Sequence, residues 1–122
     1  MIISSKAVII EYGEILLVKH DGRLTLPGGK KKENETSLET LLREVREELG
    51  CEVYPTGRPL KLEMYDRRYY FYNVAIIEKE PRQREDDLRL VWLPLGLVPK
   101  YVSRGNIGYF AGYLPIVHAF NR

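Results

Sequence analysis

Three glutamates, Glu44, Glu47 and Glu48, lie three and four residues apart in a segment with the pattern of an amphipathic helix. This spacing puts their carboxylates on one helix face, beside the apolar stripe, so packing does not require them. Like charges at i,i+4 cost about 0.2–0.5 kcal/mol, and acids in the last turn oppose the helix macrodipole by about 0.3–1 kcal/mol each. Arg43 and Arg46 offset only part of this cost. A charge cluster kept against the electrostatics of its own helix indicates a function.

A hard divalent cation is the ligand that such a cluster suits. Mg²⁺ takes carboxylate oxygens, keeps several waters and commonly shares its coordination with substrate phosphates. The segment Pro27-Gly28-Gly29 has no bulky side chain and offers a carbonyl oxygen as a further ligand. The two histidines and one cysteine, scattered along the chain, provide no material for a structural zinc site. From spacing alone, a solvated acidic face on a surface helix explains the glutamates equally well.

The helix that carries these glutamates is predicted from its apolar period and from both of its ends. Apolar side chains recur at spacings of three and four, at Leu38, Leu41, Leu42, Val45 and Leu49. Thr36 followed by Glu39 has the form of a capping box, and Gly50 stands where a helix C-cap belongs.

Short apolar runs on either side of the helix predict a β-sheet. Ala7–Tyr12 and Glu14–Lys19 flank Gly13 and indicate a β-hairpin. Leu24–Leu26 is expected to be a short strand that ends at the proline and glycines after it. The later expected elements are strands at Leu60–Tyr65, Tyr69–Ile77 and Leu88–Leu93, a charged loop at Glu80–Asp87 and a second helix at Ile107–Phe120. Strands mixed with two helices on opposite sides predict a layered α/β sandwich.

The composition predicts one soluble domain spanning residues 1–122. The chain has 122 residues, 44% apolar and 30% charged, which fits a globular domain. Its single cysteine, Cys51, excludes an intrachain disulfide and favours a reducing cytosol. Ser4-Ser5-Lys6 interrupts the apolar N-terminus, and no run approaches the roughly 20 apolar residues that cross a bilayer. A net charge of +2 does not argue for nucleic-acid binding. We therefore expect a cytoplasmic monomer or homodimer without a membrane or nucleic-acid partner.

The segment that begins at Gly29, GKKKENETSLETLLREVREELGC, resembles the Nudix box, Gly-x5-Glu-x7-Arg-Glu-U-x-Glu-Glu-x-Gly-U, where U is a bulky aliphatic residue. The matching positions are Gly29, Glu35, Arg43, Glu44, Val45, Glu47, Glu48 and Gly50. Only Cys51 departs, and because a buried cysteine behaves as a small hydrophobe we expect looser packing but unchanged chemistry. Seven fixed identities at about 6% usage each coincide by chance about once in 10⁶ chains of this length. The resemblance therefore favours a metal site over a solvated acidic surface as the explanation of the three glutamates.

The Nudix resemblance implies a role for each matched residue. It implies that Glu44, Glu47 and Glu48 bind Mg²⁺, with Mn²⁺ as an alternative, often together with the carbonyl oxygen of Gly28. It also implies a mixed sheet between helices, an α/β/α sandwich in which the box forms a loop–helix–loop.

The resemblance further implies that Glu35 and Arg43 orient or support the metal ligands. The general base differs between family members, and Glu44 and Glu47 are its candidates within the box. Candidates from the late loop are Glu85, Asp86 and Asp87.

The reaction implied by the resemblance is hydrolysis of a nucleoside diphosphate linked to another moiety, by attack of water on phosphorus. Metal ions neutralise phosphate charge, lower the pKa of a bound water and align it for in-line displacement. Small size and missing subfamily markers favour a MutT-like enzyme that converts a nucleoside triphosphate to a monophosphate and pyrophosphate. The alternatives are a dinucleoside polyphosphate hydrolase and a nucleotide-sensing domain without turnover, although an intact box argues against a sensor.

Tyr69 and Tyr72 are secondary candidates for substrate binding, because a tyrosine ring can stack on a nucleobase. Aromatic residues that alternate along a strand are more often part of the core. Tyr69 also lies near the position at which diadenosine polyphosphate hydrolases of the Nudix family carry a tyrosine. The lysines that follow the glycines, Lys30–Lys32, are within reach of substrate phosphates, but a solvated loop is the preferred explanation.

Overall fold

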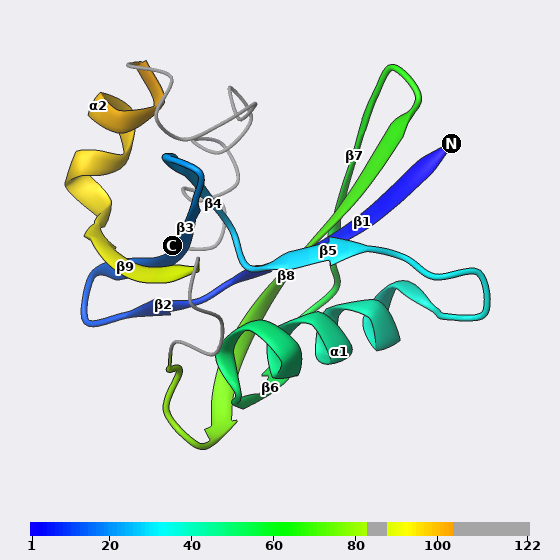
Figure 1. Cartoon of the computed structure of the whole chain (residues 1–122), viewed down its shortest axis with the longest axis horizontal. Coiled ribbons are helices and arrows are strands. Elements are labelled where there is room, and N and C mark those ends of the chain that lie inside the picture. The colour runs from blue at the N-terminus through cyan, green and yellow to red at the C-terminus, as the bar shows by residue number, and fades with distance from the viewer. Residues whose placement is uncertain (83–87, 104–122) are drawn as a thin grey trace.

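The computed structural model describes residues 1–82 and 88–103, and its strands form two sheets (Figure 1). The first sheet has the order β5–β1–β8, and β8 pairs further with β6 and with β7. Its strands are β1 (Ile2–Val8), β5 (Gly28–Lys30), β6 (Glu52–Pro55), β7 (Leu60–Met64) and β8 (Arg67–Glu78). Strand β1 runs parallel to β8 and antiparallel to β5, so this sheet is mixed, as the resemblance implied.

In the second sheet, β3 pairs antiparallel with β2, β4 and β9. The strands are β2 (Ile10–Glu11), β3 (Glu14–His20), β4 (Arg23–Thr25) and β9 (Arg89–Pro94). Tyr12 and Gly13 have φ of 51° and 75°, the two positive values that a tight hairpin turn of type I′ requires. The predicted hairpin is thus confirmed at β2–β3, but Ala7–Tyr12 is not one strand. It divides at Ile9 between the two sheets, because its apolar residues serve both.

Helix α1 (Ser37–Leu49) forms as its sequence predicts. The side chain of Thr36 accepts from the Glu39 backbone N–H while the Glu39 carboxylate accepts from the Thr36 N–H, a complete capping box. Gly50 ends the helix with φ of 64°, and its N–H donates to the Arg46 carbonyl. The helix therefore holds its glutamates in a fixed register.

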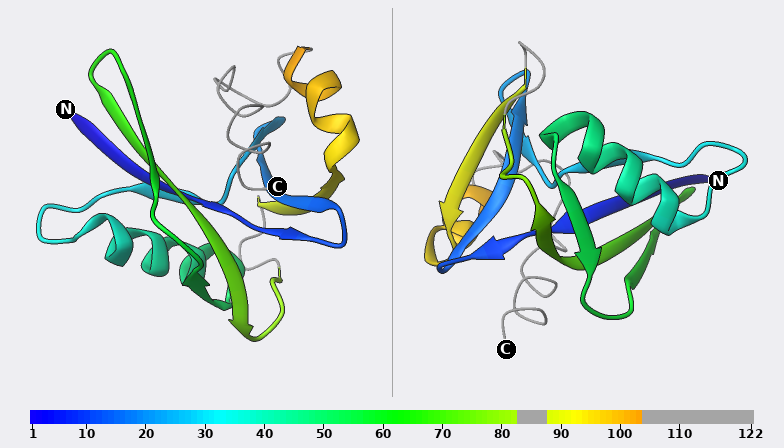
Figure 2. Two further views of the ribbon diagram at one scale, coloured as in Figure 1. Left: turned by 180° about the vertical axis from the view of Figure 1, so that it is seen from behind. Right: turned by 90° about the horizontal axis from the view of Figure 1, so that it is seen from below.

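Helix α1 packs on β1, β5 and β6, so it covers one face of the first sheet (Figure 2). The core has two parts because side chains alternate along β1, β3 and β8. One part is formed by side chains from strands of both sheets and includes Val8, Ile15, Leu17, Leu26, Tyr69 and Phe71. The part beneath α1 includes Ala7, Leu16, Leu41, Val45, Leu49, Cys51 and Tyr72. Cys51 is buried among apolar side chains, which confirms its interpretation as a small hydrophobe.

The remaining predicted strands are found as β4, β7, β8 and β9, near their expected bounds. Strands β5 and β6, the short 3-10 helix η1 (Leu95–Leu97) and helix α2 (Val98–Ser103) were not predicted. The expected helix at Ile107–Phe120 and residues 83–87 of the charged loop lie outside the described residues. None of the helices in the described part of the chain has the length and apolar character to cross a membrane.

Candidate active site

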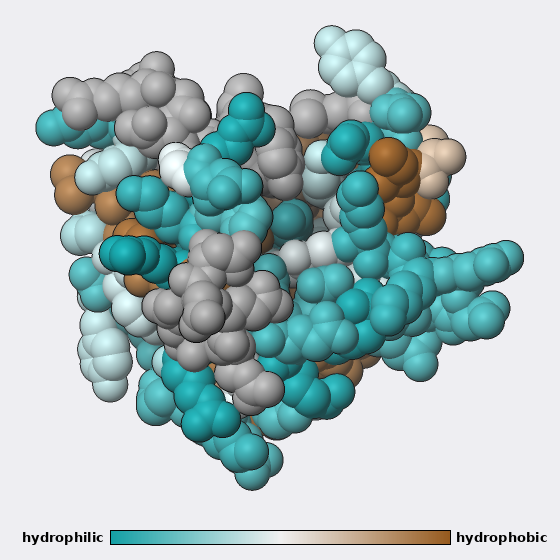
Figure 3. Space-filling model, viewed as in Figure 1, coloured by the Kyte–Doolittle hydropathy of each residue, from teal (hydrophilic) through white to brown (hydrophobic). Residues whose placement is uncertain are grey.

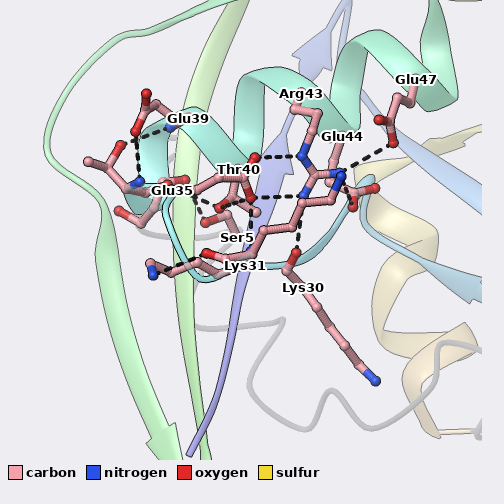
Figure 4. A network of polar contacts seen from close by, with 12 residues as sticks. Ser5, Lys30, Lys31, Glu35, Glu39, Thr40, Arg43, Glu44 and Glu47 are labelled. Carbon is pink, nitrogen blue, oxygen red and sulfur yellow. Dashed lines mark hydrogen bonds and ion pairs between the residues drawn. The ribbon is translucent and has the colours of Figure 1, made fainter.

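Arg43 is the centre of a polar network between α1 and the loop before it (Figure 4). Its Nε donates to Glu35 Oε2 over 2.6 Å and its Nη2 to Glu35 Oε1 over 3.0 Å, so the pair is bidentate. Nη1 donates to Glu44 Oε1 at 3.0 Å and to Glu47 Oε2 at 3.3 Å. Nη2 also donates to the Lys30 carbonyl at 3.2 Å. One guanidinium thus ties strand β5, the loop and two of the box glutamates together.

Glu35 is held as a carboxylate by this network. The hydrogen bond from Arg43 and then that from the backbone N–H of Lys32 lower the pKa of Glu35 from 4.5 to about 2, with burial opposing and the Thr40 hydroxyl contributing. Glu35 in turn raises the pKa of Arg43 further above its ordinary value. The pair therefore stays ionised at neutral pH, which fits the supporting role that the resemblance implies.

The glycines of β5 lie directly against the acidic face of α1. The backbone N–H of Gly28 donates to Glu48 Oε1 over 2.8 Å. A Cβ at Gly29 would lie 2.5 Å from Cδ and Oε1 of Glu44, so the absence of a side chain leaves room for this carboxylate. At Gly28, where φ is 141°, a Cβ would meet the Ser5 carbonyl oxygen at 2.0 Å. Glycine is thus required at both positions, because other atoms of the protein lie where a Cβ would be.

Lys6, opposite Gly28 in the sheet, is a buried lysine near these glycines that was not expected from the sequence. It is 8% exposed, and its Nζ lies 3.5 Å from the Leu26 carbonyl oxygen. Burial lowers the pKa of its ammonium, and the carboxylates of Glu48 and then Glu44 partly offset that effect. A lysine directly before the apolar run of β1 was the only signal in the sequence, and it indicated an interrupted segment rather than a buried charge.

The three box glutamates share one helix face, but their carboxylates do not converge. Within residues 1–82 and 88–103, no three acidic, histidine or cysteine side chains are grouped closely enough to hold a metal ion. Instead, Glu44 and Glu47 accept from Arg43, and Glu48 accepts from Gly28. Their chemistry still fits a hard cation, because all the donors are carboxylate oxygens. Hydrophilic residues dominate the surface over α1 and the loop before it (Figure 3).

Tyr69 and Tyr72, the secondary candidates for base stacking, are both part of the core. Tyr69 is 3% exposed and its ring stacks on that of Phe71 at 5.9 Å. Tyr72 is 5% exposed, and its hydroxyl shares a hydrogen bond with that of Ser37 at the start of α1. Both rings are therefore core residues, which was the alternative explanation for them, and neither is exposed enough to stack on a nucleobase.

Among the described residues, the hydrogen bonds of Lys30 and Lys31, the candidates for phosphate binding, do not join their side chains to the glutamates of α1. Lys31 Nζ donates to the Lys32 and Glu33 carbonyls of its own loop, and Lys30 contributes a backbone carbonyl to Arg43. The late-loop acids Glu85, Asp86 and Asp87 lie outside the described residues.

A helix that carries carboxylates, packs on a glycine strand and is tied to it by an arginine is the loop–helix arrangement that the Nudix resemblance implied. The model of the NUDIX domain matches residues 4–110, and the chain belongs to that family as a Nudix hydrolase. Enzymes of this family act on small nucleotide substrates, nucleoside diphosphates linked to another moiety, and generally use divalent metal ions.

Solved structures agree with the family. The MutT Nudix hydrolase of Burkholderia pseudomallei is 28% identical, with a TM-score of 0.65 over 78% of this chain and 84% of that one. A Nudix hydrolase from Nitrosomonas europaea, 20% identical, has a TM-score of 0.75 over 99% of this chain and 90% of its own. The MutT protein of Methanosarcina mazei Go1, 23% identical, has a TM-score of 0.69 over 99% and 93%. The last two likenesses concern the fold alone, and together the three confirm the mixed α/β class.

Proposed function

We propose that this Nudix hydrolase converts a nucleoside triphosphate to a nucleoside monophosphate and pyrophosphate, using Mg²⁺ held by Glu44, Glu47 and Glu48. The observation that carries the proposal is the contact between the acidic face of α1 and the glycines of β5. It places the carboxylates beside a backbone segment with no side chains, where phosphates can approach closely. The carbonyl oxygen of Gly28 is proposed as a further ligand, and Mn²⁺ as an alternative cation.

The bound cation supplies charge neutralisation at the phosphates and a water of lowered pKa. Arg43, held by Glu35, holds the carboxylates of Glu44 and Glu47 against one guanidinium, so it controls where these two side chains point. Glu47, whose side chain is 54% exposed, is the better placed of the two general-base candidates to reach a solvent water. Glu44, at 18%, is more enclosed.

The proposed substrate class follows from what the site leaves out. A dinucleoside polyphosphate was favoured by Tyr69 alone, and that ring is buried against Phe71. We propose a small nucleotide as the only class of partner, a monomer or homodimer as the assembly, and the cytoplasm as the compartment. The free Cys51, buried and with its pKa raised to about 11 by burial first, then by the neighbouring acids, is consistent with a reducing environment.

A panel of nucleotides, assayed with millimolar Mg²⁺ for phosphate and pyrophosphate release, tests the proposal. We expect pyrophosphate from at least one nucleoside triphosphate. Reaction in ¹⁸O-water then locates the attacked phosphorus by which product, monophosphate or pyrophosphate, carries the label. Orthophosphate as the first product would contradict the bond assignment. Binding without turnover of any nucleotide would instead make the chain a sensor, the alternative from a different functional class.

A further inference from the structure

Lys6 is a buried lysine on β1, an inner strand of the first sheet, and is 8% exposed. It lies opposite Gly28 of β5 and Phe71 of β8. Lysine is almost never fully buried unless it is paired with an opposite charge. Among the described residues, its ammonium makes one hydrogen bond, a long one of 3.5 Å to the Leu26 carbonyl. Three N–H donors with so little local bonding indicate a role for the charge itself.

Among the described residues, the opposite charges that act on this ammonium are carboxylates of helix α1. The carboxylates of Glu48 and Glu44 both attract it, Glu48 more strongly. These are two of the three proposed metal ligands, and the hydrogen bonds assigned to them come from elsewhere, from Gly28 to Glu48 and from Arg43 to Glu44. Lys6 therefore acts on the pair through its charge.

Gly28 explains how Lys6, on an inner strand, comes near to a carboxylate of the helix that covers the sheet. A Cβ at Gly28 would lie 2.9 Å from the Cα of Lys6, so the glycine permits β5 to approach β1 closely at this point. The same glycine donates its N–H to Glu48. The backbone between the Cα of Lys6 and the carboxylate of Glu48 thus has no side chain of its own.

We propose that Lys6 is a charge-balancing residue of the active site: its ammonium competes with the divalent cation for Glu44 and Glu48, and it attracts the substrate phosphates that the cation brings in. An ammonium is a compact point charge that suits a phosphate oxygen. The inference rests on the proposed function, because it requires the carboxylates to bind metal and the substrate to carry phosphates. A neutral residue at position 6 then has two effects of opposite sign, tighter cation binding and weaker phosphate binding.

Two neutral variants separate charge from hydrogen bonding. Lys6→Met keeps the length of the side chain, whereas Lys6→Gln also keeps an N–H donor for the Leu26 carbonyl. Lys61→Met is the matched control, since Lys61 is half-exposed on β7 and pairs only loosely with Glu63, at 3.9 Å. Mn²⁺ binding without nucleotide is measured by electron paramagnetic resonance, and pyrophosphate binding at saturating Mg²⁺ by calorimetry.

We expect both neutral variants to bind Mn²⁺ about tenfold more tightly and pyrophosphate about tenfold more weakly, while Lys61→Met matches the wild type. Unchanged Mn²⁺ affinity in both neutral variants, or two affinities that move in the same direction, overturns the inference. Wild-type values for Lys6→Gln alone assign the effect to the Leu26 hydrogen bond and also overturn it. If one variant fails to fold by circular dichroism the other decides, and failure of both makes Lys6 a structural counter-ion. A wild type that binds no Mn²⁺ contradicts the proposed metal site itself.

Discussion

Two cations act on the carboxylates of α1, and they do so in different ways. Arg43 makes five hydrogen bonds, to Glu35, Glu44, Glu47 and the Lys30 carbonyl, from all three of its nitrogens. Lys6 acts on two carboxylates of the same helix from strand β1, and its hydrogen bond within the described residues is a single long one. The position of the Arg43 guanidinium is therefore set by its hydrogen bonds, whereas Lys6 is held in place mainly because its side chain is buried.

This difference matches the chemistry of the two groups. A guanidinium is planar and presents its donors in a rigid fork, so it sets the positions of the carboxylates that it binds. An ammonium sets no direction and contributes charge. Substitutions at the arginine side of the site should therefore change the arrangement of the ligands, while those at the lysine side should change their affinity for ions.

The largest effect is expected when the carboxylates that both cations face lose their charge. Glu47→Gln and Glu48→Gln keep the side-chain shape but remove an anionic ligand, and each should lower kcat by at least about 10²-fold. Steady-state kinetics on the nucleotide found in the panel measures this, with Glu63→Gln on the distant strand β7 as the control. Near-normal turnover in both variants would remove the metal assignment from α1.

A smaller loss is expected when Arg43 keeps its charge but loses its fork. Arg43→Lys leaves one donor group where the arginine had three nitrogens, so Glu44 and Glu47 are no longer held together. We expect activity to fall by about 10- to 10²-fold, as for other residues that orient metal ligands. Retained activity would show that charge alone suffices at position 43. Arg43 and Lys6 would then both act through charge, and not one through positioning and the other through charge.

The two glycines of β5 should separate stability from activity. At Gly29 the added Cβ meets the flexible end of Glu44, so Gly29→Ala should displace a ligand and lower kcat by about tenfold with a small change in Tm. At Gly28 the clash is with the Ser5 backbone, and Gly28→Ala should destabilise the fold by more than about 3 kcal/mol. Gly57→Ala is the control, because nothing lies within 4 Å of its Cβ position. Equal kcat for Gly29→Ala and Gly57→Ala would contradict the placement of Glu44.

The smallest effect concerns Glu35 and pH. Its pKa is about 2 in the folded protein and 4.5 without its partners. Because the folded value is the lower one, the pair contributes its full stability above pH 4.5 and loses it as the pH falls through about 2. Thermal melts of the wild type and Glu35→Gln between these values should converge with falling pH. Parallel Tm profiles for the two proteins would show that the Glu35–Arg43 pair does not contribute.

Much of the helix could be predicted from sequence because its signals are local. The leucine spacing, the capping box and Gly50 act within one or two turns, and the structure confirms all three. Strands β5 and β6 escaped prediction because their pairing is with distant residues and their sequences, two glycines with a lysine and a short segment ending in Pro55, show no strand pattern. The division of Ala7–Tyr12 between two sheets is likewise decided by partners and not by the run itself.

The same distinction holds for the candidate site. The common face of Glu44, Glu47 and Glu48 follows from the helical period, so it could be read from their spacing. The fork between Arg43 and Glu35 depends on how the loop before α1 folds back. The burial of Lys6 depends on two neighbouring strands, one of them far along the chain. No pattern confined to the residues around position 6 contains that information.

The parallel pairing of β1 with β8 has a consequence for how the enzyme is made. Each residue of β1 pairs with one about 65 positions later, Ile2 with Arg67 and Val8 with Asn73. Such contacts of high sequence separation close late, because the entropy of the intervening loop must be lost first. On a ribosome the glycines and glutamates emerge well before β8 does. We expect helix α1 to form early during synthesis, and the catalytic arrangement to be completed only after residue 73 has left the exit tunnel.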